Sequence, residues 1–416
     1  LQAVLHQRRP LDEALAAAGK LDALASRDRA FVRLLCATVL RRRGQIDALI
    51  DHCLDRPLKP KLSEVRDILR LGIAQLVFLG TPAHAAVSTA VALAEGPRLA
   101  GHKGLINAVL RRLAREGAEL TAAQDAARLN TPGWLWRAWA AAYGEATARA
   151  IAEAHLSDPP LDLTLKDGPD DWAARLGARV LATGSLRLPP GAGDIAGLPG
   201  YGEGAWWVQD AAAVLPARLL GAVAGKRVID LCAAPGGKTA QLAAAGAEVT
   251  AVDLSPPRLD RLSANLARLG LAAETVAADA TAWRPPVPAA AVLLDAPCSS
   301  TGTIRRHPDI PWLKRAEDLP ALTDLQGRLL AAAAGMIAPG GLLVYATCSL
   351  LPEEGPERVA ALLADGAPFE RVPVEPGELG GLSELIGPQG DLRTLPCHLA
   401  EAGGLDGFYV ARLRRR

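Results

Sequence analysis

Two thiols and a carboxylate follow apolar segments of this sequence at positions where chemistry is possible. Asp295 follows the apolar run 289–294 and precedes Pro297 and Cys298, and Cys348 follows the apolar run 342–347 after a Pro-Gly-Gly turn. Proline has no N–H and cannot continue a central strand, so 295–298 is predicted to be a turn that presents a carboxylate and a thiol side by side. Because ligands gather at the carboxyl ends of strands in open α/β sheets, these residues indicate a reaction centre.

The spacing of the two cysteines suits a strand, a helix at 319–337 and a second strand of one sheet. Zinc usually takes four ligands from close pairs of Cys or His, and Cys298 and Cys348 are 50 positions apart, so no metal site is predicted. Nucleophilic catalysis by a thiolate fits the pattern better. The plainer alternative is a strand-ending acid beside incidental buried cysteines, because a free cysteine packs as a small hydrophobe.

A glycine-rich loop follows another apolar segment, 228–231, and precedes a helix rich in Ala and Leu. Its glycines let backbone N–H groups at a helix N-terminus approach a ligand closely. The end of the loop, 237–239, mimics a phosphate-binding P-loop, but Cys232 stands where that motif needs glycine, which disfavours an NTPase. No G-x-G-x-x-G is present to support an NAD site. The loop is therefore predicted to bind a smaller adenosine-bearing ligand.

Acidic residues end the next two predicted strands. Asp253 ends 249–253, 17 residues after Gly236, where a ribose-binding acid belongs, and Asp279 ends 274–279 and is predicted to bind the adenine edge. A helix is predicted after Asp253, with Ser255 as its N-cap. The predicted cofactor-binding residues are Cys232, Ala233, Ala234, Pro235, Gly236, Gly237, Lys238, Asp253, Asp279 and Asp295.

The first part of the chain is predicted to be all-helical. Helices are expected at 30–43, 65–79, 82–94 and 105–115, and the first of them should turn Phe31, Leu34, Leu35, Thr38 and Val39 inward. Residues 1–120 contain 19 Lys and Arg against 12 Asp and Glu, although the whole chain carries a formal charge of only +1. Such an asymmetry indicates where a polyanion docks, and the alternative is an ordinary solvated helix face.

Three strings carry a resemblance to a known family: DLCAAPGGKT (230–239), LLDAPCSSTGTIRRHPDIPWL (293–313) and LVYATCSLLPEE (343–354). They resemble the RsmB family of ribosomal RNA small-subunit methyltransferases, within the wider NOL1/NOP2/Sun group of RNA cytosine-5 methyltransferases. The resemblance implies S-adenosyl-L-methionine as cofactor and a cytosine of 16S rRNA as substrate. It makes Cys348 the nucleophile and Cys298 the residue that assists product release, while Asp295 assists at ring nitrogen 3. DNA cytosine methyltransferases attack with the Pro-Cys thiol instead, so the reverse order of the cysteines stays open.

The resemblance also implies a multi-domain fold. A NusB-like all-α RNA-binding bundle is expected at 1–125, a linker helix with a small α+β (RRM-like) subdomain at 126–204, and a Rossmann-like α/β methyltransferase core at 205–416. In the small subdomain, Thr164 and Lys166 replace an Arg and an Asn that are usual in the family. The expected RNA-binding residues are Arg41, Arg42, Arg43, Lys103, Arg111, Arg112, Arg305 and Arg306.

Composition agrees with a globular chain, with 50% hydrophobic and 22% charged residues. No apolar run approaches the ~20 residues of a membrane span, and the first residues lack the apolar block of a signal peptide, so a cytoplasmic monomer is expected. Six cysteines in 416 residues favour reduced thiols. Two alternatives remain at this point: a tRNA or large-subunit rRNA cytosine-5 methyltransferase, and a non-catalytic RNA-binding assembly factor.

Overall fold

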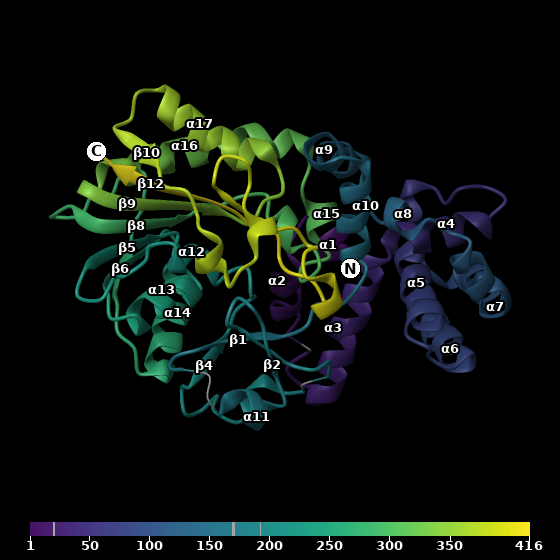
Figure 1. Ribbon diagram of the computed structural model, residues 1–416. Helices are drawn as coiled ribbons and strands as arrows, with labels where there is room; N and C mark the ends of the chain where they lie inside the picture. Colours follow the sequence, from purple (N-terminus) through teal and green to yellow (C-terminus); the bar gives the residue numbers. More distant parts are fainter. Residues whose placement is uncertain (20, 169–170, 192) are drawn as a thin grey trace. The chain divides into compact units, whose positions relative to one another are not determined.

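The computed structural model describes residues 1–416 except 20, 169–170 and 192, and it contains two compact units (Figure 1). Unit 1 consists of Leu1–Asp158 and Ile304–Ala316, and unit 2 consists of Pro159–Thr303 and Glu317–Arg416. The segment Ile304–Ala316 therefore packs with the N-terminal helices, although it follows the Pro-Cys turn in the sequence. In the described part of the chain, no helix is both long and apolar enough to span a membrane.

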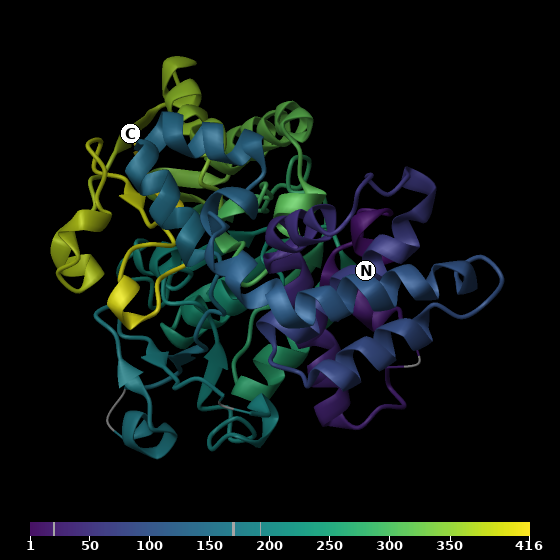
Figure 2. The ribbon, with the colours of Figure 1, turned by 90° about the vertical axis from the view of Figure 1, so that its right-hand side faces the viewer.

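Unit 1 is helical, and Figure 2 gives a second view of its N-terminal helices, coloured purple to blue. Its elements are α1 (Gln2–Leu5), α2 (Leu11–Ala16), α3 (Ser26–Arg41), α4 (Arg43–His52), η1 (Pro60–Leu62), α5 (Ser63–Ile73), the π-helical η2 (Ala74–Phe78), α6 (Ala83–Leu93), η3 (Ala100–His102), α7 (Lys103–Ala122), α8 (Ala126–Leu129), α9 (Gly133–Tyr143), α10 (Glu145–Ala154) and α15 (Ile310–Leu313). The four predicted helices are confirmed with shifted ends. Helices α4, α5 and α7 share a core that includes the fully buried Ile46, Leu69 and Leu110.

Helix α3 packs differently from its predicted pattern. Val39 is fully buried, but the side chains of Phe31 and Leu34 are 42% and 40% exposed. The prediction that both point inward is wrong, because only the C-terminal part of the helix enters the core: all buried residues of α3 lie between Thr38 and Arg41.

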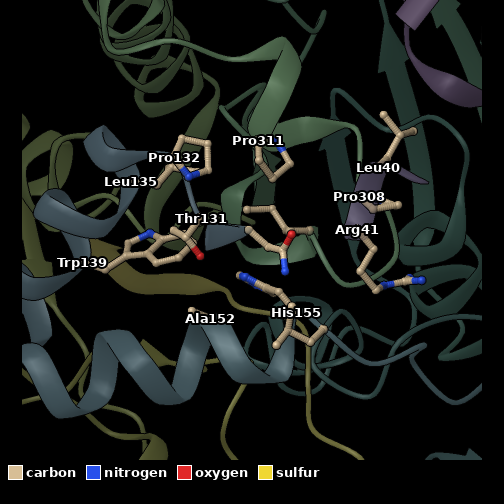
Figure 3. A pocket seen from close by; sticks show the side chains of 13 residues that line it. Leu40, Arg41, Thr131, Pro132, Leu135, Trp139, Ala152, His155, Pro308 and Pro311 are labelled. Atoms are coloured by element: carbon tan, nitrogen blue, oxygen red, sulfur yellow. The ribbon is translucent and has the colours of Figure 1, made fainter. Parts of the chain in front are cut away.

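A small cavity of about 20 Å³ lies inside unit 1 and is lined by residues that include Leu40, Arg41, Trp139 and His155 (Figure 3). The ring centroids of Trp139 and His155 are 5.4 Å apart. Burial lowers the pKa of His155 to about 3, and the charges of Arg305 and Arg41 act in the same direction. His155 is therefore neutral in the folded protein at ordinary pH.

Unit 2 begins with a small antiparallel sheet. Its strands are β1 (Asp162–Leu165), β2 (Arg179–Val180), β3 (Leu186–Arg187) and β4 (Trp206–Val208), in the order β2-β3-β1-β4. Arg187 donates to both oxygens of Asp162 at 2.7 Å, and both residues are buried. Lys166, just after β1, donates to the carbonyl of Leu269 at 3.2 Å, so this departure from the family pattern is used in an internal contact.

The larger sheet of unit 2 is mixed. Its strands are β5 (Arg227–Leu231), β6 (Glu248–Asp253), β7 (Glu274–Ala277), β8 (Ala289–Asp295), β9 (Ile337–Thr347), β10 (Phe369–Arg371), β11 (Leu392–Arg393) and β12 (Tyr409–Arg415). The order is β10-β12-β9-β8-β5-β6-β7, and β11 pairs with β12. Strands β5 to β9 are parallel to their neighbours in this group, whereas β12 is antiparallel to β9.

Helices cover both faces of this sheet, as Figure 1 shows. The helices and short helical turns of unit 2 are α11 (Trp172–Leu176), η4 (Ile195–Gly197), α12 (Leu215–Arg218), α13 (Gly237–Ala244), α14 (Pro256–Leu269), η5 (Thr301–Thr303), α16 (Leu319–Gly335), η7 (Pro352–Glu354), α17 (Pro356–Ala364), η8 (Pro376–Leu379), η9 (Ser383–Leu385) and η10 (Ala400–Ala402), and η6 (Ala316–Asp318) crosses the unit boundary. Alternate residues of β8 enter the two cores: Leu293 packs on the face that includes α12, and Leu294 packs with α16 and α17. The expected Rossmann-like α/β core and small α+β subdomain are confirmed.

Chain order reverses between β5 and β8, which is the switch point where ligands bind in such sheets. From β5 the chain continues outward to β6 and β7, and from β8 it continues in the other direction to β9. The Pro-Gly-Gly turn predicted before the last parallel strand is instead an irregularity inside β9, where the pairing shifts between Ala289 with Ile337 and Ala291 with Leu342. The carboxyl ends of β5, β6, β8 and β9 all lie at one edge.

Candidate active site

The loop after β5 is held in a tight turn by residues with positive φ. Cys232 has φ 59° and Gly236 has φ 101°. A Cβ added to Gly236 would lie 2.7 Å from Cγ of Leu262 on α14, so glycine is required both by its backbone angle and by this close approach. Helix α13 begins directly afterwards, which points its free N–H groups toward the sheet edge. Burial, together with the charges of nearby aspartates, raises the pKa of Cys232 to about 12, which keeps this thiol protonated.

Asp253 ends β6 beside this loop and is only 3% exposed. Its carboxylate accepts hydrogen bonds from the backbone N–H of Ala234 at 3.1 Å and of Ser255 at 3.0 Å. Leu254, the next residue, has a side chain that is 72% exposed. At this sheet edge, the carboxylate of Asp253 could bind a ribose, and the side chain of Leu254 could pack against an adenine ring.

Asp279 lies beyond the strand that was predicted to end with it, because β7 ends at Ala277. Its carboxylate accepts bonds from the N–H and the hydroxyl of Thr281, at 2.9 and 2.7 Å. These hydrogen bonds lower the pKa of Asp279, and the residue is exposed. Adenine binding by Asp279 stays a prediction.

Lys238 and Asp295 form an ion pair at the switch point. Lys238, in the first turn of α13, donates from Nζ to Oδ2 of Asp295 at the end of β8, at 2.7 Å. Burial opposes the charged form of the amine, but Asp295 outweighs it and the pKa of Lys238 is raised. A negative charge on Cys348 acts in the same direction on the pKa of Lys238.

The two cysteines from β8 and β9 meet at this edge. Their Sγ atoms are 3.5 Å apart, within hydrogen-bonding distance for sulfur. The hydrogen bond to Cys348, followed by burial and by the negative charges of Cys348 and Glu354, raises the pKa of Cys298 well above its usual range. Cys298 is 9% exposed, whereas Cys348 is only partly buried. The two thiols are therefore placed so that one can donate a hydrogen bond to the other, and burial favours the protonated form of Cys298.

Comparisons with known proteins agree with this geometry. The family described as 16S rRNA methyltransferase RsmB/F matches residues 217–414, and the NusB family matches residues 1–115. The ribosomal RNA small subunit methyltransferase B of Pseudomonas putida is 40% identical over 99% of this chain and 96% of its own length. The chain belongs to the RsmB family of 16S rRNA methyltransferases. The resemblance inferred from the three motifs is thus confirmed.

Solved structures show the same fold. The crystal structure of PH0851 matches with a TM-score of 0.72 and 22% identity, covering 95% of this chain and 92% of that one. The crystal structure of NSun6 from Pyrococcus horikoshii with SFG matches with a TM-score of 0.57 and 20% identity, covering 68% of this chain and 98% of that one. RsmB family members depend on S-adenosylmethionine, and the loop after β5 and the buried Asp253 provide backbone donors and a carboxylate that fit such a group.

The basic tract predicted to bind RNA is largely used inside unit 1. Arg41 is 8% exposed, pairs with Asp158 at 2.6 Å and donates to the carbonyl of Arg305 at 2.9 Å. Arg42 donates to the carbonyl of Leu156 at 2.9 Å. Arg41 is therefore buried, because the segments 154–158 and 304–313 pack on it, whereas Arg42 and Arg43 are partly buried and RNA contact by them stays a prediction.

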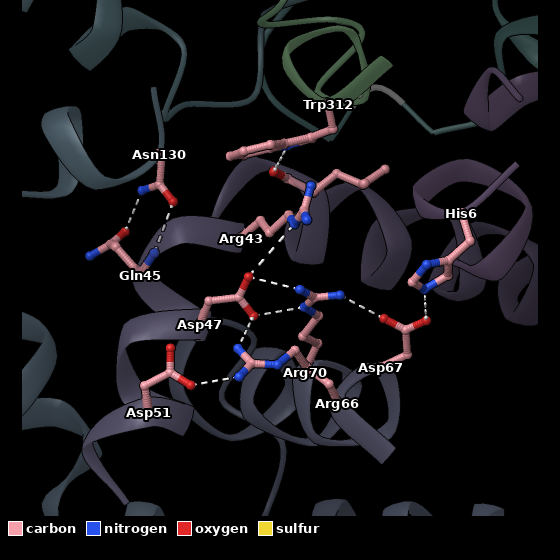
Figure 4. Close-up of polar contacts among 11 residues, drawn as sticks. His6, Arg43, Gln45, Asp47, Asp51, Arg66, Asp67, Arg70, Asn130 and Trp312 are labelled. Carbon is pink, nitrogen blue, oxygen red and sulfur yellow. Dashed lines mark hydrogen bonds and ion pairs between the residues drawn. The ribbon is translucent and has the colours of Figure 1, made fainter. Parts of the chain in front are cut away.

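Arg43 belongs to a network of ion pairs, shown in Figure 4. Its guanidinium lies 4.5 Å from the ring centroid of Trp312 and 3.7 Å from Asp47. Asp47 also accepts two bonds from the buried Arg70, both at 2.8 Å. Trp312 in turn donates from its indole N–H to the carbonyl of Leu40 at 2.8 Å. The RRHPDIPW run therefore attaches to the helices of unit 1.

The other predicted RNA-binding residues differ in exposure. Arg305 is 2% exposed, and Arg306 and Lys103 are partly buried. Arg111 on α7 is exposed, while Arg112 pairs with Glu116 at 2.8 Å. RNA contact by these residues stays a prediction, and the exposed face of α7 offers the clearest support for it.

Three residues that contact the cysteine segments were not predicted from the sequence. Ser299 and Ser349, each directly after a cysteine, are buried and both donate to the buried carboxylate of Glu354. The only sequence signal was that each serine follows its cysteine and that two glutamates end the third motif. Neither pattern by itself predicts that the three side chains meet.

Proposed function

We propose that this chain transfers a methyl group from S-adenosylmethionine to carbon 5 of a cytosine in 16S rRNA through a covalent adduct of Cys348. Membership of the RsmB family supports the reaction and the substrate. The observation that carries the assignment of roles is the 3.5 Å contact between the two Sγ atoms beside the Lys238–Asp295 pair. With 16S rRNA as substrate, the proposed place of action is the cytoplasm.

The nucleophile is needed because carbon 5 of cytosine does not take a methyl group unaided. Addition of a thiolate to carbon 6, with a proton or strong hydrogen bond at ring nitrogen 3, converts the ring into an enamine-like nucleophile. Cys348 is suited to the addition, since it is more accessible than Cys298 and its Sγ lies 3.5 Å from that of Cys298. Asp295 with Lys238 is suited to assist at nitrogen 3 and to stabilise the charge.

Release completes the cycle. S-adenosylmethionine, when bound, supplies the methyl group that carbon 5 takes up. A base, for which solvent water is available, then takes the proton from carbon 5, the electrons of that C–H bond re-form the ring double bond, and the bond between carbon 6 and Cys348 breaks to return the Cys348 thiolate. Cys298 lies against Cys348 and is proposed to assist this elimination. The burial of Cys298 argues against its being the attacking thiol, as the order in DNA cytosine methyltransferases would require, because Cys348 is the more accessible of the two.

RNA docking is proposed for the helical unit. The NusB family match covers residues 1–115, and the exposed Arg111 and Arg115 lie one turn apart on α7. Lys103 begins the same helix. Cationic side chains on one exposed helix face release counterions when they contact phosphates, which supplies affinity without base specificity.

The test is to incubate single cysteine variants with unmodified 16S rRNA and S-adenosylmethionine. Cys348→Ala should neither methylate nor form an adduct, whereas Cys298→Ala should attack, transfer the methyl group and remain linked to RNA. A denaturing gel reveals the linked species as a slow band, and bisulfite sequencing identifies the modified cytosine. Cys53→Ala, at a free cysteine of unit 1, is the control. An adduct from Cys348→Ala and none from Cys298→Ala would reverse the two roles.

A further inference from the structure

A buried carboxylate connects the segments that follow the two cysteines. Glu354 ends η7 and its residue is 0% exposed. Its Oε1 accepts the backbone N–H of Ser299 at 2.8 Å and Nε2 of Gln326 at 3.0 Å. Its Oε2 accepts the hydroxyls of Ser299 and Ser349, each at 2.5 Å. The four donors fill the lone-pair positions of one carboxylate.

These bonds join parts of the chain that are far apart in sequence. Ser299 follows Cys298 after β8, Ser349 follows Cys348 after β9, and Gln326 lies on α16 and also donates to the carbonyl of Pro297 at 2.9 Å. The backbone of Glu354 is fixed as well, because its carbonyl accepts the hydroxyl of Tyr345 at 2.8 Å. Both cysteine segments are thus tied to one group that is itself anchored to β9.

The burial of this carboxylate costs free energy, and folding alone does not require it. Moving an ionised carboxylate from water into a protein interior is unfavourable, and here its four donors are all neutral groups. An apolar residue could fill the same volume without that cost, but it could not hold two loops in register. Hydrogen bonds to a charged acceptor are short and directional, which suits the task of fixing one thiol against another.

We propose that Glu354 is a positioning residue of the methyl-transfer reaction, which holds the Cys298 and Cys348 segments so that the two thiols remain in contact. The negative charge has a second effect. It disfavours ionisation of the nearby Cys298, in the same direction as the hydrogen bond to Cys348 and burial. This inference rests on the proposed roles of the two cysteines.

Three variants separate geometry from charge. Glu354→Gln keeps the shape: its amide oxygen can accept from Ser299 N–H and Gln326, and its amide nitrogen can donate to the two serine oxygens, but the charge is lost. Glu354→Ala removes both. Ser349→Ala removes the link from the Cys348 segment to Glu354, together with the contacts of the Ser349 hydroxyl to the hydroxyls of Ser299 and Thr301 and to the N–H of Leu351. Glu357→Gln, an exposed glutamate on α17 with the same change of charge, is the control.

The first readout is steady-state and single-turnover methylation of 16S rRNA by the full chain. Glu354→Ala should lower kcat by about 100-fold, the scale of a misplacement of about 1 Å at a reacting group, with KM for RNA within about twofold of wild type. Ser349→Ala should lower kcat by about tenfold for the same reason. Glu354→Gln should recover a large part of the loss in Glu354→Ala. A wild-type kcat in Glu354→Ala or in Ser349→Ala would overturn the proposal.

The second readout is the pH dependence of Cys298 alkylation, followed by mass spectrometry of the Cys298 peptide in a Cys348→Ala background. Adding Glu354→Gln should move the alkylation midpoint to lower pH, whereas Glu357→Gln should leave it unchanged. If Glu354 only stabilised the fold, Glu354→Ala would lower the melting temperature but leave kcat unchanged, and Glu354→Gln would leave the alkylation midpoint unchanged. That result would overturn the proposal. Failure of the proposed function is distinct, since it would appear as a Cys298→Ala variant that forms no adduct even with Glu354 intact.

Discussion

Removal of the Asp253 carboxylate is expected to weaken the affinity for S-adenosylmethionine by roughly tenfold to hundredfold. The residue is 3% exposed and holds the N–H groups of Ala234 and Ser255, so it supports the glycine-rich loop as well as any ribose. Loss of a hydrogen bond to a charged group costs about 1.5–3 kcal/mol, and each 1.4 kcal/mol is a factor of ten in Kd. In Asp253→Ala, cofactor binding should therefore weaken by at least the free energy of one such bond, about 1.5–3 kcal/mol.

Titration calorimetry of the full chain with S-adenosylmethionine measures this directly. Asp260→Ala, an exposed aspartate on α14 that changes the charge equally, is the matched control and should bind as wild type. An analogue that lacks the ribose 2′-hydroxyl separates the two roles of Asp253. Wild type should lose affinity for the analogue, and Asp253→Ala should bind both ligands about equally weakly. Unchanged affinity for S-adenosylmethionine in Asp253→Ala would refute the assignment of this residue to the cofactor.

Three further predictions concern unit 1. Burial lowers the pKa of His155 to about 3 in the folded chain, so below pH 6.5 the unfolded chain binds a proton at this residue that the folded chain does not. The free energy of unfolding should therefore fall by about 2 kcal/mol between pH 7 and pH 5. Urea unfolding should show a flatter pH dependence in His155→Gln than in wild type. Trp312→Ala removes the indole bond to the carbonyl of Leu40 and the stack on Arg43, and denaturant unfolding should show a loss of about 2–3 kcal/mol; an unchanged midpoint would contradict the attachment of 304–316. Reversing Arg111 and Arg115 to Glu should weaken RNA binding and reduce the salt slope by about 0.7–0.9 for each phosphate that the protein no longer neutralises, as filter binding over a range of salt concentrations would show.

The local sequence determined where the helices and strands form and which reactive residues follow the strands. Leucines at helical spacing in 256–269 are buried on one face of α14, and the glycine at 236 is required by its own backbone angle. The meeting of Cys298 and Cys348 could be predicted, because two neighbouring parallel strands must end at the same edge. Steric limits on a few adjacent residues and the period of apolar side chains are sufficient for such conclusions.

Only the tertiary structure decided which distant side chains pair. Arg41 is buried against Arg305 across 264 residues, Lys238 pairs with Asp295 across 57, and Glu354 holds Ser299 across 55. A basic tract, a loop lysine and a glutamate pair look the same in sequence whether they face solvent or a buried partner. Their partners are set by packing of segments that the local pattern does not relate, and the energy of a charge depends on whether that packing removes it from water. For that reason the sequence located the reaction centre of this protein, but the groups that orient it became visible only in the folded chain.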